Sequence, residues 1–156
     1  MAWSFIVGKT EPTLRARAVR FLARREHSRD ELQKKLLPLA VEGEDVNALL
    51  DDLAKRGWLS DRRLAEQHIR TRSRRFGPLK LAQQLRAKGI DEQTIAAGFR
   101  AAEIDPATTR MQSVWASRFG MLPDDERERA RQVRFLQGRG FALGEVLKFL
   151  KVTHHE

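Results

Sequence analysis

The stretch at residues 15–22, RARAVRFL, returns near the other end of the chain as RARQVRFL at residues 129–136, with seven of eight positions identical. The same register continues without a gap from 15–36 against 129–150, and half of these 22 positions are identical. An internal repeat of this length indicates an array of related units that bury apolar surface against their neighbours.

Apolar residues recur at helical spacing along the chain after residue 12, and no strand pattern is present. Three helices are expected in the first unit, over about 13–25, 28–38 and 44–56. Ser28 followed three residues later by Glu31 has the form of a capping box, so the second of these helices is expected to begin there.

The pattern of three helices then repeats in a second unit. A shift of 47 residues maps the apolar positions of the first helix onto the second unit, and a shift of 49 maps those of the later helices. Ser60 or Asp61 is expected to cap a helix that runs to about residue 74. The next helix opens at Gly77-Pro78 and stops at Gly89, and a further helix is capped by Asp91. These three helices complete the second unit.

A third, divergent unit follows. Asp105-Pro106 is expected to open a helix that runs to about residue 119. The repeated stretch 129–136 lies in the next helix, and the last helix holds Val146 and Leu150.

The expected fold is therefore all-α, an elongated and curved array of three tandem three-helix repeats with about nine helices. The expected boundaries of the repeats are 13–59, 60–104 and 105–151. A flexible N-terminal arm, 1–12, and a tail, 152–156, flank them.

Composition narrows the class of protein. The 156 residues include no cysteine and no tyrosine, so the chain has neither a disulfide framework nor thiol chemistry, which fits a reducing compartment. No apolar run approaches the roughly 20 residues that span a bilayer. Residues 1–8 lack the basic lead of a signal peptide. We expect a cytoplasmic protein that makes no membrane contact.

The positive charge is concentrated in one segment. The net charge is +9, and residues 62–90 hold nine Lys or Arg against the single acid Glu66. Residues 42–61, just before, hold six acids against Lys55 and Arg56. A block of one sign creates a field that steers an anionic partner, such as nucleic acid or an acidic protein surface.

The arginines at the end of the fourth helix cannot all lie on one helix face, because successive residues are turned by about 100°. The helix dipole stabilises a cation there by roughly 0.3–1 kcal/mol, which accounts for one or two of them. Contact with phosphate or with an acidic protein explains the excess better. The candidate binding residues are Arg62, Arg63, Arg70, Arg72, Arg74, Arg75, Lys80, Arg86 and Lys88, together with Arg131, Arg134 and Arg139 from the repeated stretch and its turn.

Two equivalent arginines, Arg25 and Arg139, stand at the turn that follows each copy of the repeated stretch. There a guanidinium could bind carbonyls that lack partners at the helix end, and we favour this structural role over a binding role. Arg20 and Arg134 lie between inward positions, where each could cover the core with its aliphatic stem.

No catalytic, metal or cofactor site is expected. His27 and His68 have no partner at metal-ligand spacing, and His154-His155 lies in the tail. The paired acids Asp51-Asp52 are interpreted as part of a solvated helix face. The acids at 124–126 lie in a first helical turn, where carboxylates interact favourably with the helix dipole. No phosphate-binding glycine loop and no hydroxyl–histidine–acid grouping is visible. The sequence indicates a protein that is not an enzyme.

The aromatic residues are expected to pack. Trp3, Trp58 and Trp115 are interpreted as packing residues, with Trp58 sealing the joint between the first two units. Phe76 and Phe141 occupy equivalent turns, and a core position is favoured for both over an exposed contact.

Five segments in order resemble the RecX family, regulators of the bacterial RecA recombinase. They are RREHSRDEL at 24–32, GWLSD at 57–61, RSRRFGP at 72–78, LRAKGI at 85–90 and FLQGRGF at 135–141. The resemblance covers about residues 14–151. It implies three tandem three-helix repeats, in agreement with the periodicity.

The resemblance also implies a function. Family members bind RecA–DNA filaments along the helical groove and restrain ATP hydrolysis, strand exchange and the co-protease activity that assists repressor cleavage. Spanning neighbouring protomers would let the array favour one filament state. Many members also bind DNA alone, so weak, salt-dependent binding to single- and double-stranded DNA is expected of a monomer without cofactors.

The alternative hypothesis is a stand-alone DNA-binding helical protein that uses the basic second repeat. Base reading favours Asn, Gln and Arg together on one exposed helix. These helices carry mostly Arg and Lys, with little base-reading chemistry.

Overall fold

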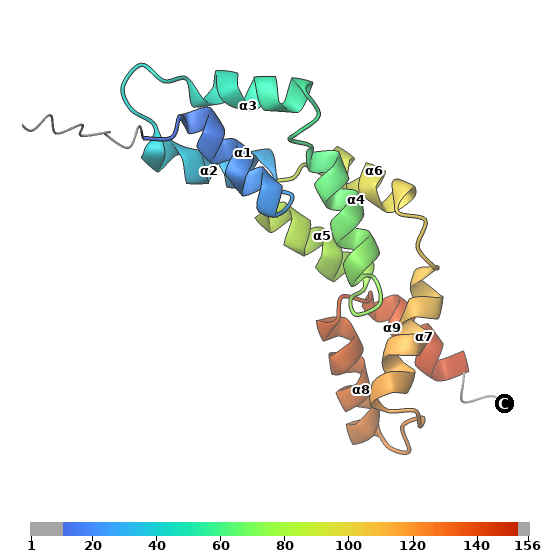
Figure 1. The fold of residues 1–156 in the computed structure, drawn as a ribbon. Coiled ribbons are helices and arrows are strands. Elements are labelled where there is room, and N and C mark those ends of the chain that lie inside the picture. The colour runs from blue at the N-terminus through green and yellow to red at the C-terminus, as the bar shows by residue number, and fades with distance from the viewer. Residues whose placement is uncertain (1–10, 153–156) are drawn as a thin grey trace, which may run out of the picture. The chain divides into compact units, whose positions relative to one another are not determined.

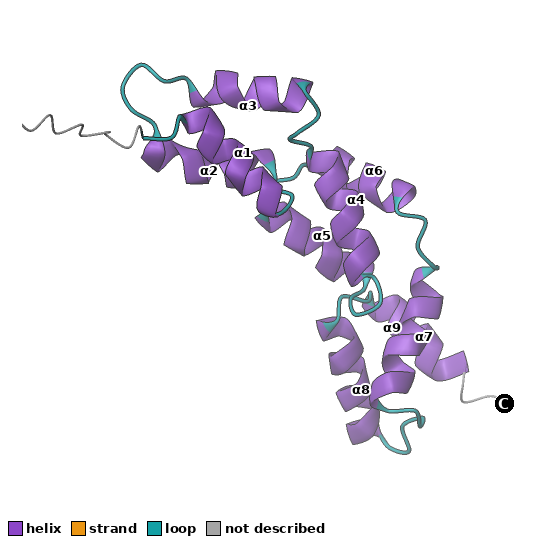
Figure 2. Cartoon of the chain, viewed as in Figure 1, coloured by secondary structure: helices purple, strands orange, loops and turns teal. Residues whose placement is uncertain are grey.

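The structure is a computed structural model that describes residues 11–152, and this range contains helices and loops without strands (Figures 1 and 2). Its nine α-helices and one 3-10 turn, in chain order, are α1 (Leu14–Arg24), α2 (Arg29–Leu36), η1 (Leu37–Leu39), α3 (Val46–Lys55), α4 (Asp61–Arg72), α5 (Pro78–Ala87), α6 (Glu92–Ala101), α7 (Ala107–Arg118), α8 (Glu126–Gly138) and α9 (Leu143–Val152).

The all-α fold with three groups of three helices is confirmed. The start of α7 differs from the prediction that Asp105-Pro106 opens this helix with a capping residue. Pro106 itself stands at the N-cap of α7, and no side chain caps that helix. Most of the arm predicted at 1–12, including Trp3, lies outside the described residues. So does most of the tail predicted at 152–156, including His154-His155.

The chain divides into two compact units, Met1–Ser60 and Asp61–Glu156. In the first unit, apolar residues of α1, α2 and α3 form one core around Leu32, Leu36 and Leu50, all fully buried. The predicted capping box is confirmed. The Glu31 amide donates to Ser28 Oγ at 3.0 Å, and the Ser28 amide donates to the Glu31 carboxylate at 3.1 Å.

Trp58 does not pack as predicted. Its side chain is 46% exposed, and the Arg56 guanidinium lies 5.6 Å from the centre of the indole ring. Leu59, the next residue, is buried in the first core instead. The helix stop at Gly57, with φ of +77°, turns the chain so that the aliphatic residue faces inward.

The second unit contains the second and third repeats, each with a core of its own. Helices α4, α5 and α6 enclose a core around Ile69, Leu81 and Leu85. Helices α7, α8 and α9 enclose another around Met111 and Leu136.

The single mismatch between the two repeated stretches has a structural reason. Ala18 in α1 is fully buried, and its counterpart Gln132 in α8 is 1% exposed. The Gln132 amide accepts a hydrogen bond from Trp115 Nε1 at 2.8 Å and donates one to the Met121 carbonyl at 3.0 Å. A buried amide is retained here because both of its ends have partners. The predicted packing role of Trp115 is confirmed, since its ring also meets Phe149 edge-on.

Candidate anion-binding surface

The turn after α4 is held against the turn after α8 by main-chain hydrogen bonds. The Gly77 amide donates to the Arg139 carbonyl at 2.7 Å, and the Leu79 amide donates to the Gly140 carbonyl at 3.0 Å. These bonds join the turn between the first and second helices of the second repeat to the turn between the second and third helices of the third repeat. Arginines of both turns are thereby brought to one place in the second unit.

The approach of the two turns depends on glycine. A Cβ added at Gly77 would stand 2.5 Å from the Gly140 carbonyl oxygen, and one added at Gly140 would overlap the backbone and Cβ of Lys80. Gly140 also has φ of +99°, a conformation that L residues rarely adopt. No other residue type fits at either position without moving the backbone.

A buried arginine that sequence reasoning missed supports the same turn. Arg110 of α7 is 7% exposed, and its Nη1 donates to the Ser73 carbonyl at 3.1 Å and to the Phe76 carbonyl at 2.8 Å. Its Nε donates to the Asp105 carbonyl at 3.1 Å. Burial lowers the pKa of Arg110, and the Asp105 charge opposes that shift. Carbonyl dipoles, rather than a carboxylate, satisfy this guanidinium.

The supported turn carries three exposed arginines, Arg72, Arg74 and Arg75. Among the described residues, no carboxylate lies at ion-pair distance from any of them. Their positive charge is therefore not neutralised locally. This turn is the centre of the candidate surface.

Other predicted binding residues are paired with acids. Arg70 forms an ion pair with Glu66 one turn earlier on α4, and Arg86 pairs with Glu92 of α6 through two nitrogens. Hydrogen bonding to Arg86 lowers the pKa of the Glu92 carboxyl. Exposed pairs of this kind contribute little to stability, because water screens them, but they reduce the charge offered to a partner.

The remaining members of the predicted basic window lie apart from the turn or are partly covered. Arg62 and Arg63 are exposed in the first turn of α4. Lys80 is half-buried against Gly140, and Lys88 is half-buried at the C-cap of α5.

The predicted arginines of α8 lie among acids. Arg131 pairs with Glu128 at 3.4 Å. Arg131 and Arg134 line an open polar depression with Asp125, Arg127 and Glu128. Arg134 is exposed.

The carbonyl contact expected of the paired turn arginines is present for Arg25, whereas Arg139 contacts aromatic rings instead. Arg25 donates to the Glu26 carbonyl at 2.9 Å and pairs with Glu31 at 3.1 Å. The Arg139 guanidinium instead lies 5.7 Å from the centre of the Phe76 ring and 5.3 Å from that of Phe135. Arg139 is therefore surrounded by aromatic rings, whereas its counterpart Arg25 in the first repeat is surrounded by polar groups.

The two described histidines are structural. His27 is 1% exposed; its Nδ1 lies 3.0 Å from the Arg25 carbonyl and its Nε2 2.8 Å from Lys35 Nζ. Burial lowers the pKa of His27, against the opposing effect of the Arg25 carbonyl. His68 Nε2 donates to the Gln84 amide oxygen at 2.8 Å. Within residues 11–152, no group of three His, Asp or Glu is placed to bind a metal ion.

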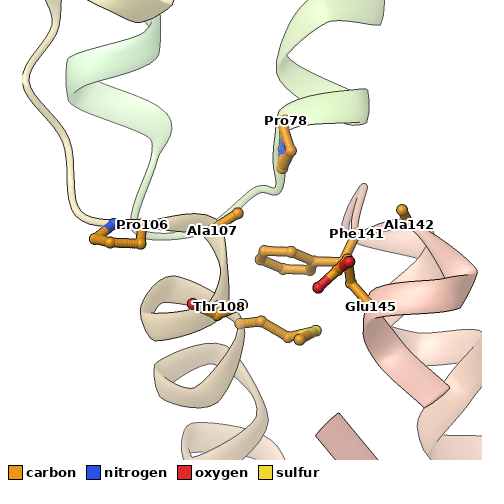
Figure 3. Close-up of a pocket in the computed structure, with 8 residues that line it drawn as sticks. Pro78, Pro106, Ala107, Thr108, Phe141, Ala142 and Glu145 are labelled. Atoms are coloured by element: carbon orange, nitrogen blue, oxygen red, sulfur yellow. The ribbon is translucent and has the colours of Figure 1, made fainter. Parts of the chain in front are cut away.

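An apolar cavity of about 220 Å³ lies beside the joined turns (Figure 3). The Phe141 ring points into it, and Glu145 contributes its one carboxylate (Figure 3). Its lining consists of Pro78, Pro106, Ala107, Thr108, Met111, Phe141, Ala142 and Glu145. Phe141 is 3% exposed, which confirms its predicted core position. None of the predicted binding residues contributes to this cavity.

In the part of the chain that the structure describes, no helix is both long enough and apolar enough to cross a membrane.

Three family models match the chain in sequence order. They are described as the first, second and third three-helix domains of RecX, and they match residues 15–53, 60–98 and 109–150.

Relatives and solved structures agree with these matches. The regulatory protein RecX of Leptothrix cholodnii is 42% identical over 147 residues, covering 92% of this chain and 91% of the relative. That of Chromobacterium violaceum is 43% identical over 129 residues, or 83% of each chain. A crystal structure of RecX from Lactobacillus salivarius superposes with a TM-score of 0.76 at 18% identity, covering 90% of this chain and 94% of that one.

Proposed function

The chain belongs to the RecX family of regulatory proteins, and we propose that it is a negative regulator of a RecA-type recombinase. It binds the RecA–DNA filament along the groove and acts without catalysis. By contacting more than one protomer, it restrains ATP hydrolysis, strand exchange and co-protease activity. Its place of action is the cytoplasm.

The observation that carries the proposal is the unpaired charge at the joined turns. Arg72, Arg74 and Arg75 lack carboxylate partners within the described residues, and a buried scaffold of Arg110 and the two glycines holds their turn in place. A fixed cationic turn suits a filament whose DNA presents a continuous run of phosphates. It equally suits an acidic face of the recombinase.

A steady-state ATPase assay of recombinase on single-stranded DNA tests the site. The triple variant R72Q/R74Q/R75Q removes the unpaired charges, and R20Q/R24Q/R100Q removes three exposed charges elsewhere. We expect the turn variant to need about ten-fold more protein for half inhibition, and the control less than about three-fold more. Equal loss in both variants would contradict a role for the turn.

The alternative, a stand-alone DNA-binding protein, is supported by the same unpaired arginines. Binding to bare DNA and to recombinase-coated DNA, measured across a range of salt concentrations, separates the two. The regulator is expected to prefer the coated DNA and to keep that preference at high salt, where phosphate contacts weaken. Equal inhibition of recombinase that has formed no filament would refute groove binding.

A further inference from the structure

The apolar cavity beside the joined turns is larger than a packing defect. It measures about 220 Å³, whereas protein interiors contain few voids larger than a water molecule, whose share of liquid volume is about 30 Å³. An apolar cavity of about 150 Å³ is already large enough to bind benzene. The cavity therefore has room for one aromatic side chain.

The walls of the cavity are apolar and held in place by the fold. Met111 and Phe141 are 1% and 3% exposed, and both belong to the core of the third repeat. Pro78 and Pro106, whose rings restrict the backbone, line the cavity from the starts of α5 and α7 (Figure 3). Because these groups are already ordered, a ligand that enters the cavity loses little affinity to ordering of the protein.

Apolar surface continues near the cavity. Leu79 follows Pro78 and is 57% exposed, and Leu143 follows Ala142 and is 46% exposed. The Leu79 amide is bonded to the carbonyl of Gly140, three positions before Leu143, so both leucines lie at the joined turns. Exposed apolar side chains near an apolar cavity are typical of a surface that contacts another protein.

The charge at the cavity is opposite to that of the chain. Glu145 is the one charged residue in the described lining, in a chain whose net charge is +9. Its side chain is 51% exposed and has a long contact, 3.6 Å, with Lys148. A carboxylate at an apolar site favours a cationic group and repels phosphate. The cavity therefore differs in chemistry from the cationic turn.

Main-chain donors are also available at the cavity. Pro106 stands at the N-cap of α7, and no side chain caps that helix. The amides of its first turn, which include Ala107 and Thr108, have no acceptor within the helix. Both residues line the cavity. A bound peptide therefore finds donors for a main-chain carbonyl group next to the apolar space.

We propose that the cavity is a docking site for a segment of a partner protein. The segment places an aromatic side chain in the cavity, and an adjacent lysine or arginine pairs with Glu145. The volume favours a single side chain over a free ligand, because sites for drug-sized molecules measure about 300–1,000 Å³. Aromatic side chains that fill pockets are frequent anchors of protein–protein contacts. The inference is independent of recombinase regulation, and its test uses neither recombinase nor nucleic acid.

Methionine methyl NMR of the full chain tests the site with the peptide acetyl-Gly-Trp-Lys-Gly-amide. The salt concentration is about 0.15 M, which limits the effect of distant charges. Met111 lines the cavity, and Met121, which is 73% exposed and outside the lining, is the internal reference. We expect the Met111 resonance to shift with a Kd of about 1 mM, since one side chain is buried, and the Met121 resonance to stay in place. An unshifted Met111 resonance at about 10 mM peptide would overturn the proposal.

Three further probes test the chemistry of the ligand. We expect acetyl-Gly-Trp-Glu-Gly-amide to bind about five-fold weaker, because Glu145 repels it, and acetyl-Gly-Ala-Lys-Gly-amide to leave Met111 unshifted. We expect 3-methylindole, the same side chain without a peptide, to bind about ten-fold weaker. Equal affinity of the glutamate peptide would refute the charge pairing, and binding of the alanine peptide would refute the aromatic anchor. Equal affinity of 3-methylindole would reassign the cavity to small aromatic molecules.

A charge reversal at the cavity tests the pairing from the side of the protein. In E145K the preference should reverse, so that the glutamate peptide binds more tightly than the lysine peptide. The control E126K reverses an acid of α8 that is 92% exposed and outside the lining, and it should keep the wild-type preference. An unchanged preference in E145K would refute the role of Glu145.

A substitution that fills the cavity tests the location of the aromatic side chain. Ala107→Leu is expected to weaken binding of the lysine peptide by more than about five-fold, with thermal unfolding at or above that of the wild type, because cavity-filling substitutions commonly stabilise a protein. The control Ala130→Leu adds the same side chain at an exposed position of α8 and should bind as the wild type does. Full affinity in a folded A107L variant would place binding elsewhere and overturn the proposal.

Discussion

Replacing Arg110 by methionine should separate the joined turns of the second and third repeats. The substitution removes three hydrogen bonds and leaves the carbonyls of Ser73, Phe76 and Asp105 without the donor that satisfies them. Methionine keeps much of the apolar volume, so the variant tests the hydrogen bonds rather than packing.

The magnitude follows from these three hydrogen bonds. Hydrogen bonds from a charged donor contribute about 1.5–3 kcal/mol each. Removing a buried charge also relieves its desolvation, which offsets part of that loss. We expect a net loss of about 2–4 kcal/mol in the free energy of unfolding of the second unit. For a unit of this size the loss corresponds to roughly 10–20 °C in Tm.

Calorimetry measures the global effect, and native-state hydrogen exchange locates it. The amides of Gly77 and Leu79, which bond to the third repeat, should lose protection most. The matched control is Arg100→Met on an exposed position of α6. If R110M melts within about 2 °C of R100M and the two amides keep their protection, Arg110 does not hold the turn.

Three further outcomes are expected. Gly140→Ala should destabilise the second unit by more than about 3 kcal/mol in urea unfolding, because the added Cβ overlaps Lys80 and the φ of Gly140 is +99°. The control Gly138→Ala, whose Cβ meets open space, should be neutral or stabilising by about 0.5 kcal/mol. Ser28→Ala should cost the first unit about 1 kcal/mol through loss of the α2 cap; an unchanged urea midpoint would contradict this. The pKa of His27 is lowered in the folded state, so the unfolded chain binds its proton first, and the first unit should lose stability as pH falls below about 6.5. In His27→Gln that part of the pH dependence should vanish, and an identical dependence would refute the assignment.

Local signals in the sequence account for the helices and their caps. The Ser28 and Glu31 pair predicted the start of α2 because the capping box involves only residues three apart. The helix predicted over 44–56 ends close to where it was expected for a similar reason, since a left-handed stop depends on one residue, Gly57, with φ of +77°. Trp58 was misjudged because the sequence does not reveal which of two adjacent apolar residues turns inward.

The candidate surface was predictable only as a region. The basic window located Arg72, Arg74 and Arg75, but nothing local indicated that Arg70 and Arg86 would be paired with acids. Arg110 reads as an ordinary cation on an amphipathic helix, because its carbonyl partners at 73 and 76 lie more than thirty positions earlier in the chain. The contacts of Arg139 likewise depend on rings that only the tertiary fold brings together.

The bonds between the second and third repeats run from main chain to main chain, and this has a consequence for how the protein can change. Gly77 and Gly140 must stay small and Arg110 must stay in place, but the exposed arginines nearby take no part in those two hydrogen bonds. The neighbouring exposed arginines could therefore be substituted one by one during evolution. Each substitution would change the affinity for the partner and leave the hydrogen bonds between the two turns intact.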